Sequence, residues 1–409
     1  GGQLAVIDVA ARRFAAFKTL PAHNIRGLAW SADGRQLVVS HKTLSPLAYT
    51  DAADAHWGSI VSNVLRSLDR DSLENPNKDV LANSHLFQLG DVGNGAADPA
   101  SVAVTKDGTV YVALAGVGEV AAGRLAPGPF PRHDTEFHRL PVGVRPTALA
   151  TSADGSQLYV ADTFGDAIIV TKWNEYHSII GDPVRISLGP QPPLSLADRG
   201  ERLFYDARLS HDHWMSCHSC HTDGHSSDQL SDTLGDGSFG APKRIPPLGG
   251  VADTAPWAWT GSIRDLDKQV FKSITTTMHG EGLFGEKVLC LTAYLESLPP
   301  APPLDVPGDA DAKAAVERGR ALFMRHGCDH CHVPPTYTSS KTFDVGLKDE
   351  LGNRKFNPPS LRGVGQRSAF FHDGRAEMLG VVFGRFHHPG ETNLSAREDA
   401  DLLAFLRSL

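Results

Sequence analysis

The stretch Met215-Ser216-Cys217-His218-Ser219-Cys220-His221 decides how the second half of this 409-residue chain is organised, and Cys328-Asp329-His330-Cys331-His332 repeats its pattern. Both contain Cys-x-x-Cys-His, the attachment signature of c-type haem. Thiols at this spacing can each add to one haem vinyl group, and the histidine that follows is then close enough to bind the iron. We therefore expect two covalent haem groups, held by Cys217, Cys220 and His221 in the first motif and by Cys328, Cys331 and His332 in the second.

Two other sites use pairs of cysteines at this spacing, a zinc site built from two knuckles and a redox dithiol of the thioredoxin type. Neither explains a histidine directly after both pairs, and the motifs lie far apart in the sequence. Cys290 is the one cysteine outside them, and its apolar neighbours predict a buried, inert thiol.

Composition restricts the partners of the chain. The formal net charge is -8, from 47 acidic and 39 basic residues that are not gathered in blocks, which argues against nucleic acid and allows a redox protein with a complementary basic patch. No run of 18 apolar residues predicts a membrane-spanning helix. The chain begins Gly-Gly-Gln, and haem c is attached outside the bacterial inner membrane, so we expect a removed targeting segment and a periplasmic or extracellular location.

The region before the first motif contains a repeated unit. Residues 27–40, 101–114 and 148–161 each read as a short apolar strand, a Ser/Thr-x-Asp-Gly turn and a second strand rich in β-branched or aromatic residues. Asp-Gly suits a tight turn because glycine tolerates positive φ, and the flanking alternation predicts a hairpin. Each unit continues into a further pair of strands, and four strands at this period indicate a β-propeller blade.

The number of blades does not complete a ring. Propellers close with about four to eight blades, whereas residues 1–187 provide three units and a leading half-unit at 4–9. The spacing of the first two Asp-Gly turns also leaves extra residues, which we place in a polar insertion between 43 and 84 that could reach toward a partner or the haem domains.

Beyond residue 187 the pattern becomes helical. Proline-rich joints at 189–194 and 299–303 divide the remainder, and amphipathic segments precede and follow each haem motif. The predicted fold is therefore an all-β propeller, incomplete as counted, followed by two mainly α-helical cytochrome c domains. Its boundaries are 1–187 for the propeller blades, 188–300 for the first cytochrome domain and 301–409 for the second.

Six stretches around the haem motifs carry a family resemblance. They are GERLFYDARLS at 200–210, PPLGGVA at 246–252, WTGSIRDLDKQ at 259–269, GRALF at 319–323, PPSLRGV at 358–364 and FFHDGR at 370–375. With these stretches in this order, residues 199–409 resemble the bacterial di-haem cytochrome c peroxidase family, which includes the MauG enzymes. The repeats before them resemble YVTN-type propeller blades.

The resemblance implies a division of labour between the two haem groups. In the family, one haem has an accessible iron face where peroxide reacts, the other stores and delivers electrons, and a tryptophan lies between them. Trp259 falls on the motif of that tryptophan, although an aromatic core position is the alternative. The resemblance also allows a calcium ion between the haem domains.

The chain departs from the family on the far side of the first haem. Gly235-Asp236-Gly237 stands where related enzymes that need reductive activation carry a distal histidine. Threonine appears near the position of the distal acid-base glutamate, so His279 or Glu281 could transfer the proton that cleavage of the O–O bond requires. The alternative for His279 is that it is itself an axial ligand and closes the site.

A further departure concerns the second haem. Phe386 occupies the position of the family's distal Met or Tyr and cannot bind iron, but His387 and His388 follow it directly. We expect one of these histidines to be the sixth ligand, because a His/His pair gives a lower potential than His/Met and suits an electron-supplying centre. Met378 is the rival ligand. His372 and Arg375 are expected to contact a propionate or to pack between domains.

The leading functional hypothesis is a periplasmic di-haem oxidoreductase of the peroxidase type. It would reduce hydrogen peroxide, or use it to oxidise a partner, with a small cytochrome c or cupredoxin as redox partner and the propeller as docking platform. The second hypothesis is a non-catalytic electron-transfer module that serves an activity elsewhere. In the third, the propeller is the main recognition surface and the cytochromes are a redox tether.

Overall fold

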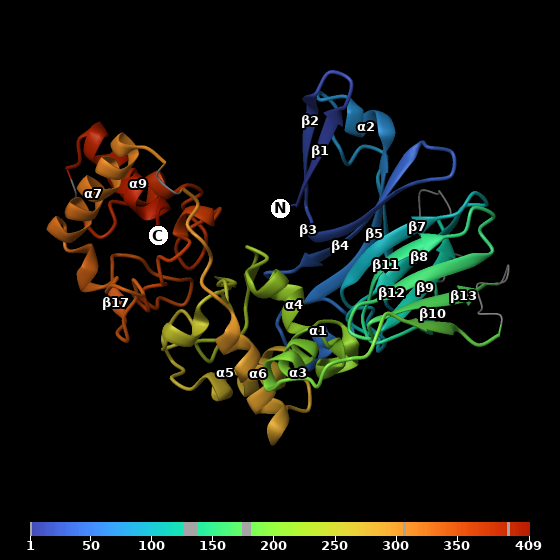
Figure 1. Ribbon diagram of the computed structural model, residues 1–409. Coiled ribbons are helices and arrows are strands. Elements are labelled where there is room, and N and C mark those ends of the chain that lie inside the picture. Colours follow the sequence, from blue (N-terminus) through green and yellow to red (C-terminus); the bar gives the residue numbers. More distant parts are fainter. Residues whose placement is uncertain (1, 126–136, 174–180, 306–307, 391–392) are drawn as a thin grey trace.

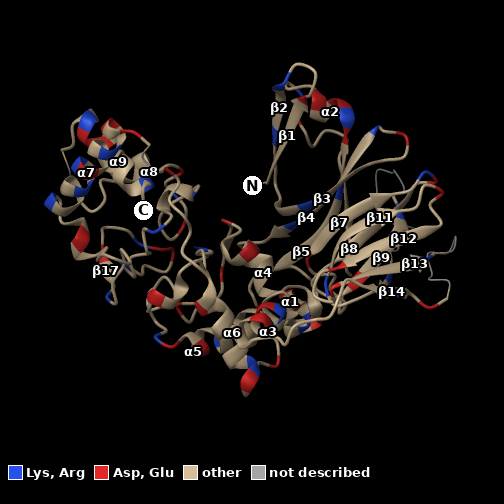
Figure 2. Ribbon diagram, in the orientation of Figure 1, with Lys and Arg blue, Asp and Glu red and all other residues tan. Residues whose placement is uncertain are grey.

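The computed structural model describes residues 2–125, 137–173, 181–305, 308–390 and 393–409. Figure 1 shows a β-sheet region in blue to green, a first helical region in yellow-green to gold, and a second helical region in orange to red. The first helical region lies between the other two. Lys and Arg are interspersed with Asp and Glu along the chain (Figure 2), as the dispersed charges of the sequence predicted.

The β-sheet region contains three antiparallel sheets, each of four strands in sequence order. They are β3 (His23–Trp30), β4 (Gln36–Leu44), β5 (Val61–Asp69) and β6 (His85–Gln88); β7 (Pro99–Val104), β8 (Thr109–Leu114), β9 (Glu119–Arg124) and β10 (His138–Pro141); and β11 (Pro146–Thr151), β12 (Gln157–Asp162), β13 (Ala167–Lys172) and β14 (Val184–Ser187). A hairpin of β1 (Gly2–Asp8) and β2 (Arg13–Leu20) precedes them.

These sheets follow the repeat found in the sequence. The Asp-Gly turns join β3 to β4, β7 to β8 and β11 to β12, and their glycines all have positive φ, for example +87° at Gly108. Strand β7 contacts both β3 and β11, so the sheets stack in chain order. Among the described residues they do not close into a ring, so the all-β architecture is confirmed and the propeller, incomplete as counted, stays a prediction.

The insertion expected between residues 43 and 84 is partly a regular element of the first sheet. Strand β5 lies within it and pairs with β4 along its whole length. The remainder forms two short helices, α1 (Ala52–His56) and α2 (Arg70–Glu74). The segment containing α1 reaches the first helical region, where Thr50 Oγ1 donates a hydrogen bond of 2.5 Å to Asp232 O.

The helical regions have related layouts. The first contains α3 (Leu196–Phe204), α4 (Cys217–Cys220), α5 (Leu266–Lys272) and α6 (Glu286–Ser297), with a short pair of strands, β15 (Leu230–Ser231) and β16 (Lys243–Arg244). The second contains α7 (Ala310–Arg325), α8 (Leu379–Gly384) and α9 (Ala396–Arg407), with β17 (Phe343–Asp344) and β18 (Lys355–Phe356). None of the helices in the described residues has the length and apolar character needed to cross a membrane.

Each helical region is built on one close helix crossing. A Cβ added at Gly200 of α3 would lie 1.9 Å from Cys290 O of α6, and one added at Gly319 of α7 would lie 2.0 Å from Asp401 O of α9. The phenylalanine four residues after each glycine packs on an aromatic ring of the facing helix, with centroids 5.2 Å apart for Phe204 and Tyr294. Glycine is required at both crossings because any side chain would hold the helices apart.

The element ends lie near the predicted domain boundaries. Strand β14 ends at Ser187 and α3 begins at Leu196, while α6 ends at Ser297 and α7 begins at Ala310. The division into 1–187, 188–300 and 301–409 is compatible with these ends and stays a prediction.

Candidate functional site

The first Cys-x-x-Cys-His motif begins as a single helical turn. Ser216 precedes this turn, α4, and the His221 amide closes it by donating to Cys217 O at 2.9 Å. The His221 Nδ1 atom lies 3.0 Å from Pro246 O, so the Nδ1 proton is donated to this carbonyl and the lone pair remains on Nε2. Burial lowers the pKa of His221 to about 4, which keeps the imidazole neutral. A neutral, oriented imidazole is the form that binds a metal.

The second motif repeats this arrangement with different residues. The His332 amide donates to Cys328 O at 2.9 Å, and His332 Nδ1 lies 3.0 Å from Tyr337 O. Burial, with a smaller effect of nearby charged groups, lowers the pKa of His332 to about 4. Each motif therefore presents one neutral histidine with a free Nε2.

Each motif opens onto a large cavity. The first cavity, of about 290 Å³, is lined by Cys217, Cys220 and His221 together with apolar residues of the domain core such as Ile274 and Leu291. The second cavity, of about 380 Å³, is lined by the equivalent residues Cys328, Cys331 and His332 and by a second apolar shell. Both have the size and apolar character of a site for a flat, mostly apolar cofactor.

A second imidazole faces His332 across the second cavity. The ring centroids of His332 and His388 are 6.4 Å apart. Two imidazoles on opposite sides of one metal, with metal–nitrogen distances of about 2.0 Å, have centroids roughly 6 Å apart. His388 Nδ1 is buried and has no hydrogen-bond partner. The neighbouring His387 is exposed, so only His388 of the predicted pair lines the cavity.

The rival ligand Met378 lies elsewhere. It is 66% exposed at the start of α8 and is not part of the cavity wall. Phe386, at the family's ligand position, packs against Phe371 with ring centroids 5.4 Å apart.

Cationic groups stand where the two cavities adjoin. Arg244, Arg362 and Arg367 line both cavities. The Nε atoms of Arg244 and Arg362 are buried without a partner. Carboxylate groups of a cofactor would supply acceptors for such donors. The thiols, the free histidine nitrogens and these arginines together fit a c-type haem in each cavity.

Trp259 lies in the wall shared by the cavities. Its ring lines both, and its Nε1 donates to Arg244 O at 2.7 Å. Trp257, by contrast, lines only the first cavity. His372 stacks on Phe356 at 4.3 Å, and Arg375 pairs with Asp373 outside the cavity wall. Trp259 is therefore the aromatic residue that the structure places between the two candidate haem sites.

The proposed acid-base residues His279 and Glu281 do not reach the first cavity. His279 has a positive φ of 50° and its Nε2 lies 2.7 Å from Thr50 O, so the ring points toward the β-sheet region. Glu281 is exposed, and neither residue is part of the cavity wall. The structure places neither side chain at the first cavity, and proton transfer by either residue, like His279 as an axial ligand, stays a prediction.

A polar face of the segment before His279 lines the cavity instead. Gln269, Ser273 and Thr277 follow one another at four-residue spacing, and Gln269 Nε2 donates to Ser273 Oγ at 3.0 Å. Gln269 Oε1 is buried without a partner. Lys272 also lines the cavity and donates to Thr233 O and, at 3.5 Å, to Thr277 Oγ1. The spacing is visible in the sequence and could have suggested this face.

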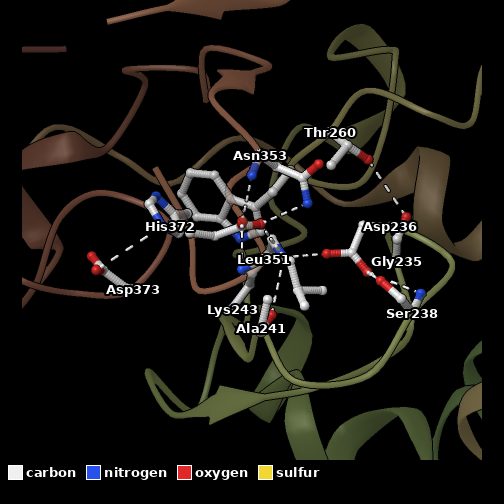
Figure 3. A network of polar contacts seen from close by, with 12 residues as sticks. Gly235, Asp236, Ser238, Ala241, Lys243, Thr260, Leu351, Asn353, His372 and Asp373 are labelled. Carbon is white, nitrogen blue, oxygen red and sulfur yellow. Dashed lines mark hydrogen bonds and ion pairs between the residues drawn. The ribbon is translucent and has the colours of Figure 1, made fainter. Parts of the chain in front are cut away.

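Asp236, at the position of the missing distal histidine, belongs to an ion network between the haem domains (Figure 3). Lys243 Nζ lies 2.6 Å from Asp236 Oδ2 and 3.2 Å from Asp349 Oδ2. The side chain of Asp349 is fully buried and also accepts from Asn353 Nδ2 at 3.0 Å. Within the described residues, no group of three metal-ligating side chains occurs at this junction. Calcium here is thus implied by the resemblance alone.

The first motif is also tied to the β-sheet region by a contact that the sequence did not indicate. Ser216 Oγ and Ser219 Oγ donate to Asp98 at 2.5 and 2.7 Å, and Lys42 forms an ion pair with the same carboxylate. Burial alone would raise the pKa of Asp98, but the charges of Lys42 and His218 and the hydrogen bonds outweigh it, so the pKa is lowered. Residues inside the first haem motif therefore rest on a buried carboxylate of another domain.

Comparison with known proteins agrees with this geometry. The family model described as di-haem cytochrome c peroxidase matches residues 195–292. The methylamine utilization protein MauG of Methylorubrum extorquens is 28% identical over 270 residues, which cover 51% of this chain and 76% of that protein. The cytochrome c551 peroxidase of Pseudomonas aeruginosa is 25% identical over 275 residues, covering 53% and 80%.

A solved structure of hydrazine synthase from Kuenenia stuttgartiensis also matches, with 21% identity and a TM-score of 0.46, and it covers 53% of this chain and 89% of that one. The MauG and peroxidase matches accompany two complete haem-attachment motifs. These matches support a relationship of the C-terminal half of the chain to the di-haem cytochrome c peroxidase and MauG family.

Proposed function

We propose that the protein is a periplasmic di-haem c oxidoreductase in which the first cavity is the site of peroxide chemistry and the second is an electron-transfer centre. One observation carries this assignment. The second cavity has an imidazole, that of His388, opposite its motif histidine, whereas the described wall of the first cavity contains no imidazole besides His221.

A c-type haem with an open axial position supplies an iron that can bind and reduce peroxide, and a six-coordinate haem exchanges electrons. The roles of the side chains follow from their places. His221 would bind the iron of a haem in the first cavity, and its ring is oriented by the carbonyl of Pro246. His332 and His388 would both bind the iron of a haem in the second.

Proton transfer in the first cavity is assigned to the polar face of the helical segment 269–277. The Thr277 hydroxyl lies 3.5 Å from the ammonium group of Lys272, whose pKa is lowered by burial. A buried ammonium with a lowered pKa is a better proton donor than an exposed one. Lys272 would therefore hold the proton, and Thr277 would pass it into the cavity.

Electron transfer between the sites is assigned to Trp259. Its indole lies in the wall that both cavities share, and its hydrogen bond to Arg244 O holds the ring in place. An aromatic ring there would shorten the path of an electron between groups held in the two cavities.

The redox partner is proposed to be a small cytochrome c or cupredoxin that docks near the second motif. His330, within that motif, and Val333, directly after it, are exposed, the latter by 43%. The first motif is covered by the β-sheet region. The second motif thus offers the shorter route for electrons from a partner protein.

A second candidate function has one observation in its favour. The sulfur-containing side chains of Met215 and Met278 belong to the wall of the first cavity, and a thioether can be the sixth ligand of a haem iron. Both methionines are packed in the apolar core of the domain. If either were a ligand, both irons would be six-coordinate and the chain would be a pure electron-transfer module.

Electron paramagnetic resonance of the oxidised, haem-loaded protein distinguishes the two. We expect one high-spin and one low-spin ferric signal in equal amounts. Two low-spin signals and no high-spin signal would overturn the peroxidase assignment. The variants Met278→Leu and Met215→Leu complete the test, because a thioether ligand is identified by the appearance of a high-spin signal when it is removed.

A further inference from the structure

Three potential metal-ligating side chains meet where the β-sheet region contacts the first helical region. His56 ends α1, and His211 and Asp212 form the turn shortly before the first haem motif. His56 Nδ1 lies 2.6 Å from Asp212 Oδ2, and His211 Nε2 lies 3.3 Å from the same oxygen. All three ligand atoms lie within 4.8 Å of one another. We propose that this cluster binds one divalent transition metal ion of the zinc type and joins the two domains.

The chemistry of the ligands selects the metal. Two imidazoles and a carboxylate are typical zinc ligands, whereas magnesium and calcium prefer oxygen ligands alone. With metal–ligand bonds of about 2.0 to 2.1 Å, neighbouring atoms of a tetrahedral site are roughly 3.3 Å apart. The 3.3 Å distance from His211 Nε2 to Asp212 Oδ2 already fits this value, and the 2.6 Å distance from His56 Nδ1 needs to open by about 0.7 Å. Three protein ligands leave the fourth position for water.

A simple ion pair does not account for the arrangement. The pairing of His56 with Asp212 would satisfy both side chains, yet His211 points at the same carboxylate oxygen. Two protonated imidazoles on one oxygen would repel each other. A divalent cation among the three groups would attract the lone pairs of both imidazole nitrogens and the carboxylate oxygen, so it accounts for the convergence of all three ligand atoms.

The backbone holds the three ligands in place without the metal. The Trp214 indole donates to His56 O at 3.2 Å, Gly95 N donates to Asp212 O at 2.6 Å, and His211 N donates to Met278 O at 2.9 Å. Asp212 also has a left-handed φ of 52°, which is uncommon for a residue with a side chain. A site whose ligands are positioned in advance loses less entropy when it binds.

The site has room for the ion and its water. The side chains of His56, His211 and Asp212 are 45%, 39% and 24% exposed. The site is separate from the haem cavities, since none of its residues lines either one. The site is nevertheless connected to the first haem cavity. His211 N donates a hydrogen bond to Met278 O, and Met278 is part of the wall of that cavity.

The test uses the full-length, haem-loaded protein after treatment with a chelator. Titration calorimetry with zinc chloride is expected to show one site per chain, and magnesium or calcium chloride none. His211→Ala and Asp212→Asn are each expected to weaken this site by about 100-fold, at least as much as loss of an outer-shell group of a metal site. His85→Ala, a histidine of β6 outside the cluster, is the matched control and should leave binding unchanged.

Two further measurements keep the proposal open to refutation. Circular dichroism and the haem absorption bands identify a variant that fails to fold, and Asp212→Asn preserves the shape of the side chain. Anomalous scattering from a zinc-soaked crystal should place one peak between the three ligands. Equal zinc affinity in the native protein and in the His56→Ala/His211→Ala double variant, or a peak only at other histidines, would overturn the proposal.

Discussion

The two haem-attachment motifs have the same sequence pattern but opposite surroundings. The first rests on the β-sheet region, with His218 and Ser219 buried, and opens onto a cavity with hydroxyl and amide groups in its wall. The second has an exposed His330 and opens onto a cavity that already contains a second imidazole. The difference shows that the motif determines where a haem is attached, while residues far away in the sequence determine what its iron can do.

The largest effect on this difference between the two sites is expected when His388 is removed. In His388→Ala the second iron loses its proposed sixth ligand, so its low-spin ferric signal should convert completely to high-spin. His387→Ala, which alters the exposed neighbour, should leave the spectrum unchanged. Electron paramagnetic resonance at low temperature checks both. A low-spin signal that survives in His388→Ala would identify a different ligand.

A second test removes the contacts that hold the first haem motif against the β-sheet region. Asp98→Asn leaves Lys42 buried without its counter-charge and weakens the bonds from Ser216 and Ser219. Breaking a buried pair costs about 3 to 5 kcal/mol of unfolding free energy. Chemical denaturation at pH 7 measures this, with Asp107→Asn on an exposed turn as control.

The pH dependence of Asp98→Asn follows from the lowered pKa of the native carboxylate. A lowered pKa in the folded state contributes stability above the unfolded carboxyl's pKa of about 3.9, and the contribution is lost as the pH falls below it. The difference between native protein and variant should therefore shrink in acid. A difference that is independent of pH would contradict the assigned charge.

The helix crossings allow the two haem domains to be compared directly. Gly319→Ala places a methyl group against Asp401 O, and Gly200→Ala places one against Cys290 O. Overpacking costs about 1 to 3 kcal/mol, more than the gain of up to about 1 kcal/mol in helix propensity. Gly380→Ala in α8, whose nearest neighbour is 3.8 Å away, is the control and should not destabilise. Thermal unfolding followed at the haem bands tests whether each change affects its own domain.

Trp259→Phe tests the link between the two sites. Loss of the indole and of its bond to Arg244 O should slow electron transfer between the haem groups by about tenfold, equivalent to about 1.4 kcal/mol in the barrier. Rapid-mixing spectroscopy of the half-reduced protein with peroxide measures the rate. Trp257→Phe, which alters a ring on the first cavity alone, is the matched control. Equal rates in both variants would remove Trp259 from the path.

The smallest effect is expected at the ion pair between α7 and α9. Arg318 donates two hydrogen bonds of 2.7 Å to Asp401, and this hydrogen bonding lowers the pKa of the Asp401 carboxyl. Because Arg318 is 45% exposed, Arg318→Gln should lower the stability at pH 7 by less than any of the changes above. The loss should fade as the pH drops below about 4. Arg320→Gln, at an exposed position of the same helix, is the control for denaturation at both pH values.

Local patterns predicted much of this molecule. The haem motifs, the Asp-Gly hairpins and the helical segments depend on neighbours a few residues apart, so the sequence contains their signals directly. The choice between His387 and His388 depends on a backbone turn, with φ of 48° at His387, that no periodicity indicates. The direction of the His279 ring was unpredictable for the same reason, since its own positive φ turns the ring toward Thr50.

Contacts between domains were the least predictable part. Lys42 and Asp98 are separated by 56 residues, and their partners Ser216 and Ser219 lie more than a hundred residues further along the chain. The insertion before residue 84 also concealed strand β5, because Asn63, Arg66 and Ser67 are buried together with its apolar residues and interrupt the alternation.

The burial of His218 and Ser219 has a consequence for the maturation of the protein. An enzyme that attaches haem to Cys217 and Cys220 needs access to the segment between the two thiols. In the folded protein, Asp98 and Asn24 cover that segment. Attachment at the first motif is therefore expected to precede docking of the β-sheet region, whereas the exposed second motif imposes no such order. Docking of the β-sheet region onto the first helical region would then be the step that encloses the first haem.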